Sequence, residues 1–142
     1  MTQKQIKIVR ASWSKVAALD PVIVGELFYN RLFTIAPGVE HLFKGPMPGQ
    51  SRKLMAMLSY VISKLNRLED ILDEVAALAK RHVVYGVKPE YFAPVGAALL
   101  WTLEQGLGPD WNEETKAAWI ACYTILSSAM IQTIQEAEHK AA

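Results

Sequence analysis

Apolar residues recur at steps of three and four along almost the whole chain, which is the spacing of one face of an α-helix. No segment shows the sustained alternation of apolar and polar residues that a half-buried strand would have. A capping box of the form Thr-x-x-Gln opens at Thr2 and predicts a first helix that runs to about Leu19. Asp20 followed by Pro21 predicts the start of a second helix, which Pro37 ends or turns into a short piece of new helix.

Breaks rich in glycine and proline divide the remainder of the chain, at residues 44–49, 85–89 and 106–109. The apolar rows between them predict four further helices, over about residues 50–65, 68–82, 91–105 and 112–137. The sequence shows no internal repeat, low-complexity tract or linker. It therefore predicts one all-α domain over residues 1–142, with six to eight helices whose short connections pack successive helices against one another.

Composition supports a single soluble domain. Hydrophobic residues make up 51% of the 142 positions, which is enough for a sizeable core. The net charge is +1 and no basic stripe stands out, so we expect no nucleic-acid partner. The start has no apolar signal core and no run of about 18 apolar residues suggests a membrane span, so we expect a cytoplasmic protein. The single cysteine, Cys122, is interpreted as a small buried hydrophobe in a reducing compartment.

Three histidines are the candidate metal ligands. His139 lies in a charged tail and is interpreted as solvated, and His41 lies in a short turn with polar neighbours. His82 differs, because it continues an apolar helical row and so points toward the core. That row consists of Ile71, Val75, Leu78 and Ala79. On spacing alone, a hydrogen-bonded core histidine is the commoner interpretation, but a neutral imidazole can also bind a metal through one nitrogen and donate from the other.

Two polar residues lie next to apolar rows that could face the same interior. Gln50 begins a row on the preceding predicted helix, and Tyr29 lies four residues before Phe33. The row that Gln50 begins continues through Leu54, Met57, Leu58 and Val61. On spacing alone, a surface glutamine and a core tyrosine explain these positions as well as a functional site does.

Other chemistries have no motif in this chain. It lacks the glycine-rich dinucleotide loop, the P-loop, the nucleophile elbow and the zinc-protease motif. One cysteine and three scattered histidines cannot form a zinc cluster of the usual spacing. A Cys-x-x-Cys-His motif is absent, so any haem would be held non-covalently.

The residues in this order resemble the globin family over nearly the whole chain, and most of all single-domain bacterial globins, neuroglobin and the haem domain of flavohaemoglobins. The resemblance rests on Phe28-Tyr29-Asn30-Arg31-Leu32-Phe33, Pro37 with Leu42-Phe43, Gln50-Ser51-Arg52-Lys53-Leu54, Arg81-His82 with Tyr85-Gly86-Val87, and Val95-Gly96 with Ala117-Ala118-Trp119. It implies a globin fold around a pocket that holds haem b.

The resemblance also implies roles for particular residues. His82 matches the proximal ligand of the haem iron, and Tyr29 and Gln50 match the two distal positions that face bound gas. Pro37 matches the proline that opens the short third helix. Gly25 and Ser51 match small residues where two helices cross closely. The implied haem contacts are Phe43 against the ring, Leu54 above the iron, Lys53 at a propionate, and Leu58, Leu78 and Val87 around the apolar plate.

The proximal side departs from the flavohaemoglobin pattern. A tyrosine and a glutamate stand near the proximal histidine in those proteins, and the matching positions here hold Phe92 and Ile134. Tyr91 lies one residue away, and Pro94 is shifted by one from the family's proline, so another register remains open. Without the carboxylate the imidazole is a weaker electron donor, which favours reversible gas binding.

Several functions follow from this resemblance. The first is reversible O₂ binding for storage, delivery or scavenging, with high affinity and slow release from Tyr29 and Gln50. The alternative is NO dioxygenation or nitrite reduction at the same iron with a separate reductase, because no flavin or nicotinamide domain fits in 142 residues. A gas sensor would need an output domain, and a helical interaction module would need no haem. We expect O₂, NO, CO or nitrite as ligands and a monomer or weak dimer.

Overall fold

The computed structural model describes residues 1–84 and 87–141, and for residues 69, 83, 84 and 137–141 it describes the backbone alone. The described chain is helical, without a strand. The α-helices are α1 (Gln3–Ala17), α2 (Pro21–Ile35), α3 (Met47–Ser63), α4 (Leu72–Val84), α5 (Phe92–Leu107) and α6 (Glu113–Ala141). Short 3-10 segments are η1 (Pro37–Leu42), η2 (Leu65–Ile71), η3 (Pro89–Tyr91) and η4 (Gly108–Asp110). The predicted all-α class is confirmed.

Local capping determines where several helices begin. At Thr2 both hydrogen bonds of the predicted capping box are present, to and from Gln5. The Asp20 carboxylate accepts a hydrogen bond from the backbone N–H of Val22, and the proline between them occupies the first turn of α2. Asn112 accepts from the backbone N–H of Thr115 and caps α6. These starts are therefore encoded by short-range hydrogen bonds.

The prediction of one helix over residues 68–82 is wrong at its start. Residues Leu65–Ile71 form the 3-10 segment η2, and α4 begins only at Leu72. Arg67 has non-helical angles, with φ −141° and ψ 46°, so the chain turns there from α3 into α4. Leu65, Leu68 and Ile71 are three residues apart, which suits a 3-10 helix as well as one face of an α-helix. Apolar spacing could not distinguish the two.

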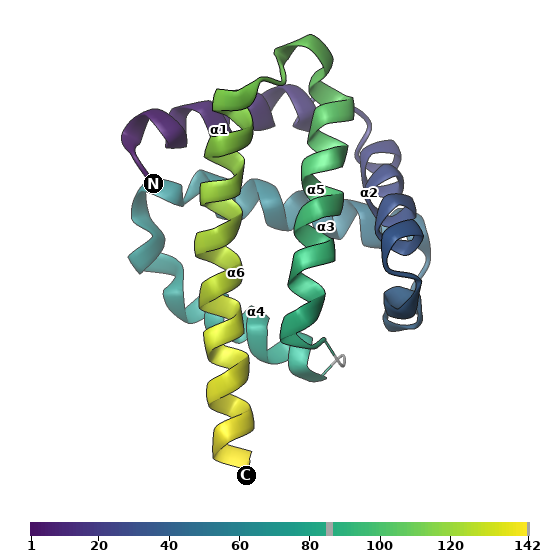
Figure 1. Cartoon of the computed structure of the whole chain (residues 1–142), viewed down its shortest axis with the longest axis vertical. Helices are drawn as coiled ribbons and strands as arrows, with labels where there is room; N and C mark the ends of the chain where they lie inside the picture. Colours follow the sequence, from purple (N-terminus) through teal and green to yellow (C-terminus); the bar gives the residue numbers. More distant parts are fainter. Residues whose placement is uncertain (85–86, 142) are drawn as a thin grey trace.

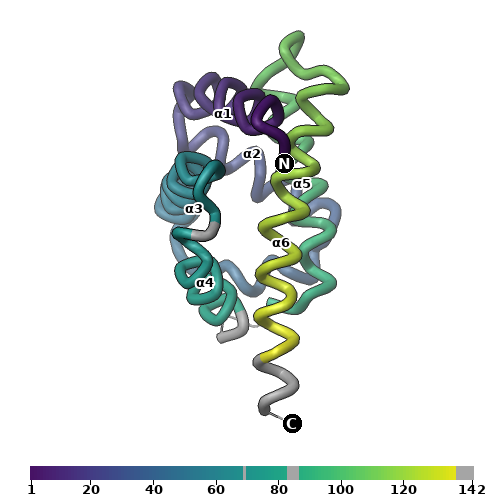
Figure 2. The backbone as a smooth tube through the Cα atoms, turned by 90° about the vertical axis from the view of Figure 1, so that its left-hand side faces the viewer, coloured from purple at the N-terminus to yellow at the C-terminus, as the bar shows by residue number. Residues whose placement is uncertain are grey.

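The helices enclose an interior between two pairs. In Figure 1, α5 and α6 run side by side in front of α3 and α4. Figure 2 separates the pairs, with α1 crossing above both. Helix α2 packs against α3 and α5, while α6 packs against α1 and α4. The interface of α4 with α6 has its own apolar cluster, made of Ile71, Val75, Ala79, Met130 and Ile134.

Helix α6 also has the length and composition that a membrane span requires. In the part of the chain that the structure describes, it is the one helix that meets both criteria, over Glu113–Glu136, and 28% of its apolar 18-residue window is buried. In this fold its buried residues include Trp119, whose indole N–H donates to the Ser12 hydroxyl at 2.9 Å. Core helices of soluble proteins also meet these criteria, so the expectation of no membrane segment stays a prediction.

A glycine permits the close crossing of α2 and α3. A Cβ atom at Gly25 would lie 2.6 Å from the Cα of Ser51 and closer still to its Cβ. Ser51 is fully buried, and its hydroxyl has no hydrogen-bond partner. The two backbones therefore meet at this point because neither residue has a larger side chain. The crossing places Tyr29, one turn beyond Gly25, beside the first turns of α3.

We expect Gly25→Ala to lower the free energy of unfolding by about 1–3 kcal/mol, because the added methyl group forces the two helices apart. The matched control is Gly49→Ala, since nothing lies within 4 Å of a Cβ atom there. Urea denaturation measures both. In the double variant Gly25→Ala/Ser51→Gly the loss should be smaller than the sum of the two single losses. Additive losses would show that the two residues do not share a contact.

Candidate functional site

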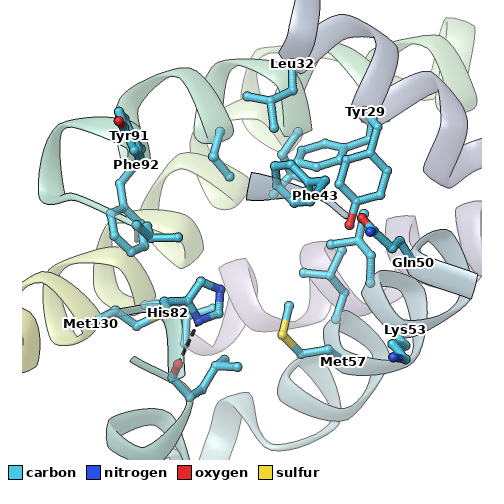
Figure 3. A pocket seen from close by; sticks show the side chains of 18 of the residues that line it. Tyr29, Leu32, Phe43, Gln50, Lys53, Met57, His82, Tyr91, Phe92 and Met130 are labelled. Carbon is cyan, nitrogen blue, oxygen red and sulfur yellow. Dashed lines mark hydrogen bonds between the residues drawn. The ribbon is translucent and has the colours of Figure 1, made fainter. Parts of the chain in front are cut away.

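A cavity of about 900 Å³ lies between the helices, and every predicted cofactor or ligand residue lines it. These residues are Tyr29, Phe43, Gln50, Lys53, Leu54, Leu58, Leu78, His82 and Val87. They come from α2, from the end of η1, from α3 and α4, and from the segment after residue 86. In Figure 3, His82 projects into the pocket from one side, while Tyr29, Phe43 and Gln50 converge on the other. The fold thus brings together residues that are up to 58 positions apart in the sequence.

His82 is oriented by its own helix. Its Nδ1 atom lies 2.7 Å from the carbonyl oxygen of Leu78, one turn earlier in α4. Because a carbonyl oxygen can only accept, Nδ1 carries the hydrogen and donates it. In the neutral imidazole the lone pair is then on Nε2. Histidines that bind a metal through one nitrogen commonly donate from the other to a backbone carbonyl. The His82 ring is in this tautomer and so suits metal coordination through Nε2.

The surroundings of His82 are apolar. Phe92 and Met130 line the cavity, and Ile134 is buried in the cluster between α4 and α6. Figure 3 shows the ring of Phe92 directed toward His82 and that of Tyr91 directed away from it, which supports the register inferred from the sequence. The described hydrogen-bond partner of Nδ1, the Leu78 carbonyl, is neutral.

Tyr29 is the aromatic centre of the opposite side. Its ring stacks on Phe33 and meets Phe28 and Phe43 edge-on, with centroid distances of 6.0, 5.1 and 5.1 Å. Only 6% of its surface is exposed. Burial raises the pKa of the Tyr29 phenol to about 12, from an ordinary value of 10.0. The hydroxyl therefore stays protonated at neutral pH and can donate a hydrogen bond into the cavity.

The Gln50 amide has a definite orientation. Its Nε2 atom donates to the carbonyl oxygen of Gly45 at 3.1 Å, and its Oε1 atom is buried without a hydrogen-bond partner. The Gly45 carbonyl cannot donate, so the nitrogen must be the atom that faces it. This differs from the sequence expectation of an N–H pointing at bound gas. In this arrangement the polar atom that Gln50 leaves without a partner is an acceptor.

Charged residues on the cavity wall are all basic. Lys44, Lys53 and Arg81 line it, and no Asp or Glu is among its described lining residues. All three are exposed or half-buried, so they belong to the mouth rather than the depth of the cavity. Only Lys53 was predicted there. An apolar interior with cations at its mouth suits a flat hydrophobic molecule with an anionic edge.

A family model described as Globin matches residues 26–130. The chain belongs to the globin family. Neuroglobin-1 of Oncorhynchus mykiss and neuroglobin of Danio rerio are each 28% identical to it over 155 residues, and each alignment covers 99% of this chain and 97% of the relative. A solved bacterial globin from Campylobacter jejuni has the same fold, with a TM-score of 0.83 and 24% identity over 97% of this chain and 99% of that one. The predicted globin resemblance and fold are confirmed.

As a globin, the protein is a haem-based gas-binding protein, and its gas ligands include molecules such as O₂. The pocket itself fits that prosthetic group. It combines an imidazole that can coordinate iron, an apolar volume for the plate and cations for its propionates. The described residues contain no group of three or more His, Cys, Asp and Glu side chains that could hold a different metal.

Some pocket residues of this globin were not predicted. Met57 shares the helical row of Leu54, so its position followed from spacing alone. Tyr123 belongs to α6, and its hydroxyl donates to the carbonyl oxygen of Phe92 at the start of α5. A Cβ at Gly96 would lie 2.6 Å from the Tyr123 ring, so the glycine makes room for it. Gly96 was therefore the one sequence signal that a bulky side chain, here Tyr123, packs against the start of α5.

The other two histidines and the cysteine differ from His82. His41 is exposed in η1 and does not line the cavity, while the side chain of His139 lies outside the described residues. Cys122 is buried, as its interpretation as a small hydrophobe predicted, and it also lines the cavity. Burial raises the pKa of its thiol to about 12, so the sulfur is a neutral S–H rather than a thiolate ligand.

The stability of the protein should fall at high pH partly through Tyr29. Between pH 10 and about 12 the unfolded chain releases a phenol proton that the folded chain keeps, so unfolding becomes easier as pH rises. At pH 11 we expect wild type to have lost about 1 kcal/mol more than Tyr29→Phe, relative to each protein at pH 8. Urea denaturation at the two pH values measures this difference. Equal losses in both proteins would contradict the buried, protonated phenol.

Proposed function

We propose that this globin holds haem b non-covalently and binds O₂ reversibly, with high affinity and slow release, for storage, delivery or scavenging in the cytoplasm. The observation that carries the proposal is the buried Tyr29 side chain, which lies on the opposite side of the cavity from His82 with its hydroxyl beside Gln50. A proton donor at that position favours a ligand that gains negative charge on binding. O₂ gains such charge and CO gains little.

The residues that would hold the group have separate tasks. His82 would hold the iron through Nε2, and its hydrogen bond to Leu78 keeps the ring in place. Phe43 would pack against the macrocycle, and Lys53 would pair with a propionate. Leu54, Leu58, Leu78 and Val87 complete the apolar wall. Burial of that wall against the plate contributes roughly 25 cal/mol per Å² of apolar surface removed from water.

Distal selectivity falls mainly on Tyr29. When bound, haem supplies the iron to which a gas molecule attaches and gives electron density to it. The Tyr29 O–H is a preorganised donor in a dry pocket, the same arrangement that stabilises developing charge in an oxyanion hole. Gln50 can act as a second donor only if its amide breaks the hydrogen bond to the Gly45 carbonyl. The loss of that bond offsets part of the stabilisation that a new hydrogen bond to the gas would give. We therefore assign the larger effect to Tyr29 and the smaller one to Gln50.

The proximal side favours binding over redox catalysis. His82 donates to a neutral backbone carbonyl, and Phe92 and Met130, which line the same cavity, carry no charge. A carboxylate partner would make the imidazole a stronger electron donor, as in haem enzymes that cleave O–O bonds. This observation supports reversible O₂ binding ahead of NO dioxygenation or nitrite reduction.

Removal of the Tyr29 hydroxyl should speed O₂ release. We expect Tyr29→Phe to raise the O₂ dissociation rate about tenfold, since loss of a hydrogen bond of about 1.4 kcal/mol corresponds to that factor. Gln50→Leu should raise it by less. Stopped-flow displacement of O₂ by CO measures both rates, and Tyr60→Phe is the control because that tyrosine is exposed on α3 and does not line the cavity. An unchanged rate in Tyr29→Phe would contradict the proposed donor.

His82 should be the axial ligand. We expect His82→Gly to lose the absorption spectrum of histidine-coordinated haem, and added imidazole to restore it by filling the vacated volume. His41→Ala is the matched control, because that histidine is exposed and outside the cavity. The readouts are the visible spectra of the ferric and ferrous forms. Unaltered axial coordination in His82→Gly would disprove the assignment.

A further inference from the structure

Two buried tryptophans form an aromatic path that leads away from the cavity. Trp119 of α6 lines the cavity, and its ring centroid lies 6.0 Å from that of Trp13 in α1, with the planes tilted by 59°. This is the separation of two aromatic rings in direct contact. Only 2% of Trp119 and 5% of Trp13 is exposed. The other two tryptophans, Trp101 and Trp111, are not among the described lining residues.

The hydrogen bonds of the two indole N–H groups differ in where they lead. The N–H of Trp119 donates to the Ser12 hydroxyl at 2.9 Å, and that hydroxyl donates onward to the carbonyl oxygen of Ile8 at 2.7 Å. A backbone carbonyl has no proton to pass on, so this chain of hydrogen bonds ends inside the protein. The N–H of Trp13 donates to the hydroxyl of Ser59 at 2.9 Å, and Ser59 is exposed on α3. Within the pair, Trp13 is therefore the residue whose proton can reach water.

A protein that binds O₂ at iron also meets hydrogen peroxide. Superoxide that escapes from such a site reacts with a second superoxide and two protons to give O₂ and hydrogen peroxide. When bound, haem makes hydrogen peroxide a strong one-electron oxidant, and this premise rests on the proposed function. The cavity wall contains easily oxidised sulfur atoms, in Met57, Cys122 and Met130. An oxidising equivalent that stayed in the cavity would therefore damage its wall.

We propose that Trp119 and Trp13 carry oxidising equivalents from the cavity to the surface, where a thiol or ascorbate quenches them. Trp119 gives one electron to the oxidant and becomes a radical cation, and Trp13 returns an electron to it. The Trp13 radical cation releases its N–H proton to water through Ser59 and becomes a neutral radical. The reductant then returns one hydrogen atom to Trp13. Two such passages supply two electrons which, with two protons from water, break the O–O bond of hydrogen peroxide and give two water molecules.

The tyrosines of the cavity wall are poorer electron donors than Trp119. A phenol gives up an electron readily only when its proton leaves at the same time, whereas an indole radical cation is a weaker acid and can keep its proton. Burial raises the pKa of both the Tyr29 and the Tyr123 phenol. The Tyr123 hydroxyl also donates to the Phe92 carbonyl, which is no base for the departing proton. The structure thus favours Trp119 as the first donor.

The test treats ferric, haem-loaded protein with hydrogen peroxide in the presence of a nitroso spin trap. Mass spectrometry of the digested protein then locates the residue that carries the trapped radical. The variants are Trp119→Phe, which removes the entrance of the path, and Trp13→Phe, which removes its end. The matched control is Trp111→Phe, because that tryptophan is half-buried and is not a described lining residue of the cavity.

A second pair of variants tests the path without altering the core. Ser59→Ala removes the proton acceptor of Trp13 and leaves both indoles in place. Ser63→Ala is its control, because Ser63 is also exposed on α3 and its hydroxyl bonds the carbonyl oxygen of Tyr60 instead. Retained haem spectra and urea denaturation show that each variant is folded, so that Ser59→Ala tests the path even if Trp119→Phe does not fold.

We expect the adduct on Trp13 in wild type. Trp119→Phe should lose most of that adduct although Trp13 is intact, and Trp111→Phe should retain it. Ser59→Ala should give less than half of the wild-type yield, and Ser63→Ala an unchanged yield. An unchanged Trp13 adduct in Trp119→Phe, or equal yields in the two serine variants, would overturn the proposal.

The same measurements separate this proposal from the proposed function. Wild type that binds haem and O₂ normally but carries its adducts on Tyr29 or Tyr123, with none on Trp13, would refute the tryptophan path alone. Wild type that does not bind haem or O₂ would refute the proposed function. A normal O₂ release rate in Trp13→Phe, together with loss of the adduct at that position, would show that the path is separate from gas binding.

Discussion

The close crossing of α2 over α3 is the constraint on which the gas-facing half of the pocket depends. Gly25 and Ser51 let two backbones meet where other residues would hold them apart. This contact places the tyrosine of one helix and the glutamine of the other at the same end of the cavity. The unpaired Ser51 hydroxyl shows that close packing here outweighs the cost of burying one unpartnered polar atom. Shape therefore takes precedence over hydrogen bonding at this crossing.

The two faces of the pocket are built on opposite physical principles. On the side of His82, a hydrogen bond to the Leu78 carbonyl within α4 orients the imidazole, and the described residues Phe92 and Met130 add apolar wall. On the distal face aromatic rings hold a phenol whose ionisation is suppressed by burial. One face therefore presents an oriented imidazole that projects into the cavity, and the other presents a buried phenol that stays protonated at neutral pH. In the proposed function, this pairing favours reversible binding of a polarised gas over its chemical conversion.

Much of this arrangement could be predicted from the sequence, because it depends on local signals. Thr2 and Asp20 cap helices through hydrogen bonds to residues two or three positions later, so the sequence alone indicates these helix starts. His82 continues an apolar row, and helical geometry therefore directs its side chain toward the core. The orientation of Gln50 was not predictable, since its partner is a backbone carbonyl with no side-chain signature. The 3-10 segment Leu65–Ile71 was missed because three-residue spacing fits both helix types. Lys44 and Arg81 were not predicted to share the cavity wall with Lys53, because that arrangement forms only when distant segments meet.

The hydrogen bond between Gln50 and Gly45 links the pocket to the outside of the molecule. Gly45 lies in the connection between η1 and α3, next to Pro46 and exposed to solvent. That carbonyl is the acceptor that keeps the Gln50 nitrogen turned toward the loop and its oxygen buried. The polarity that Gln50 presents to the interior therefore depends on the backbone position of an exposed connection as well as on the side chains of the cavity wall.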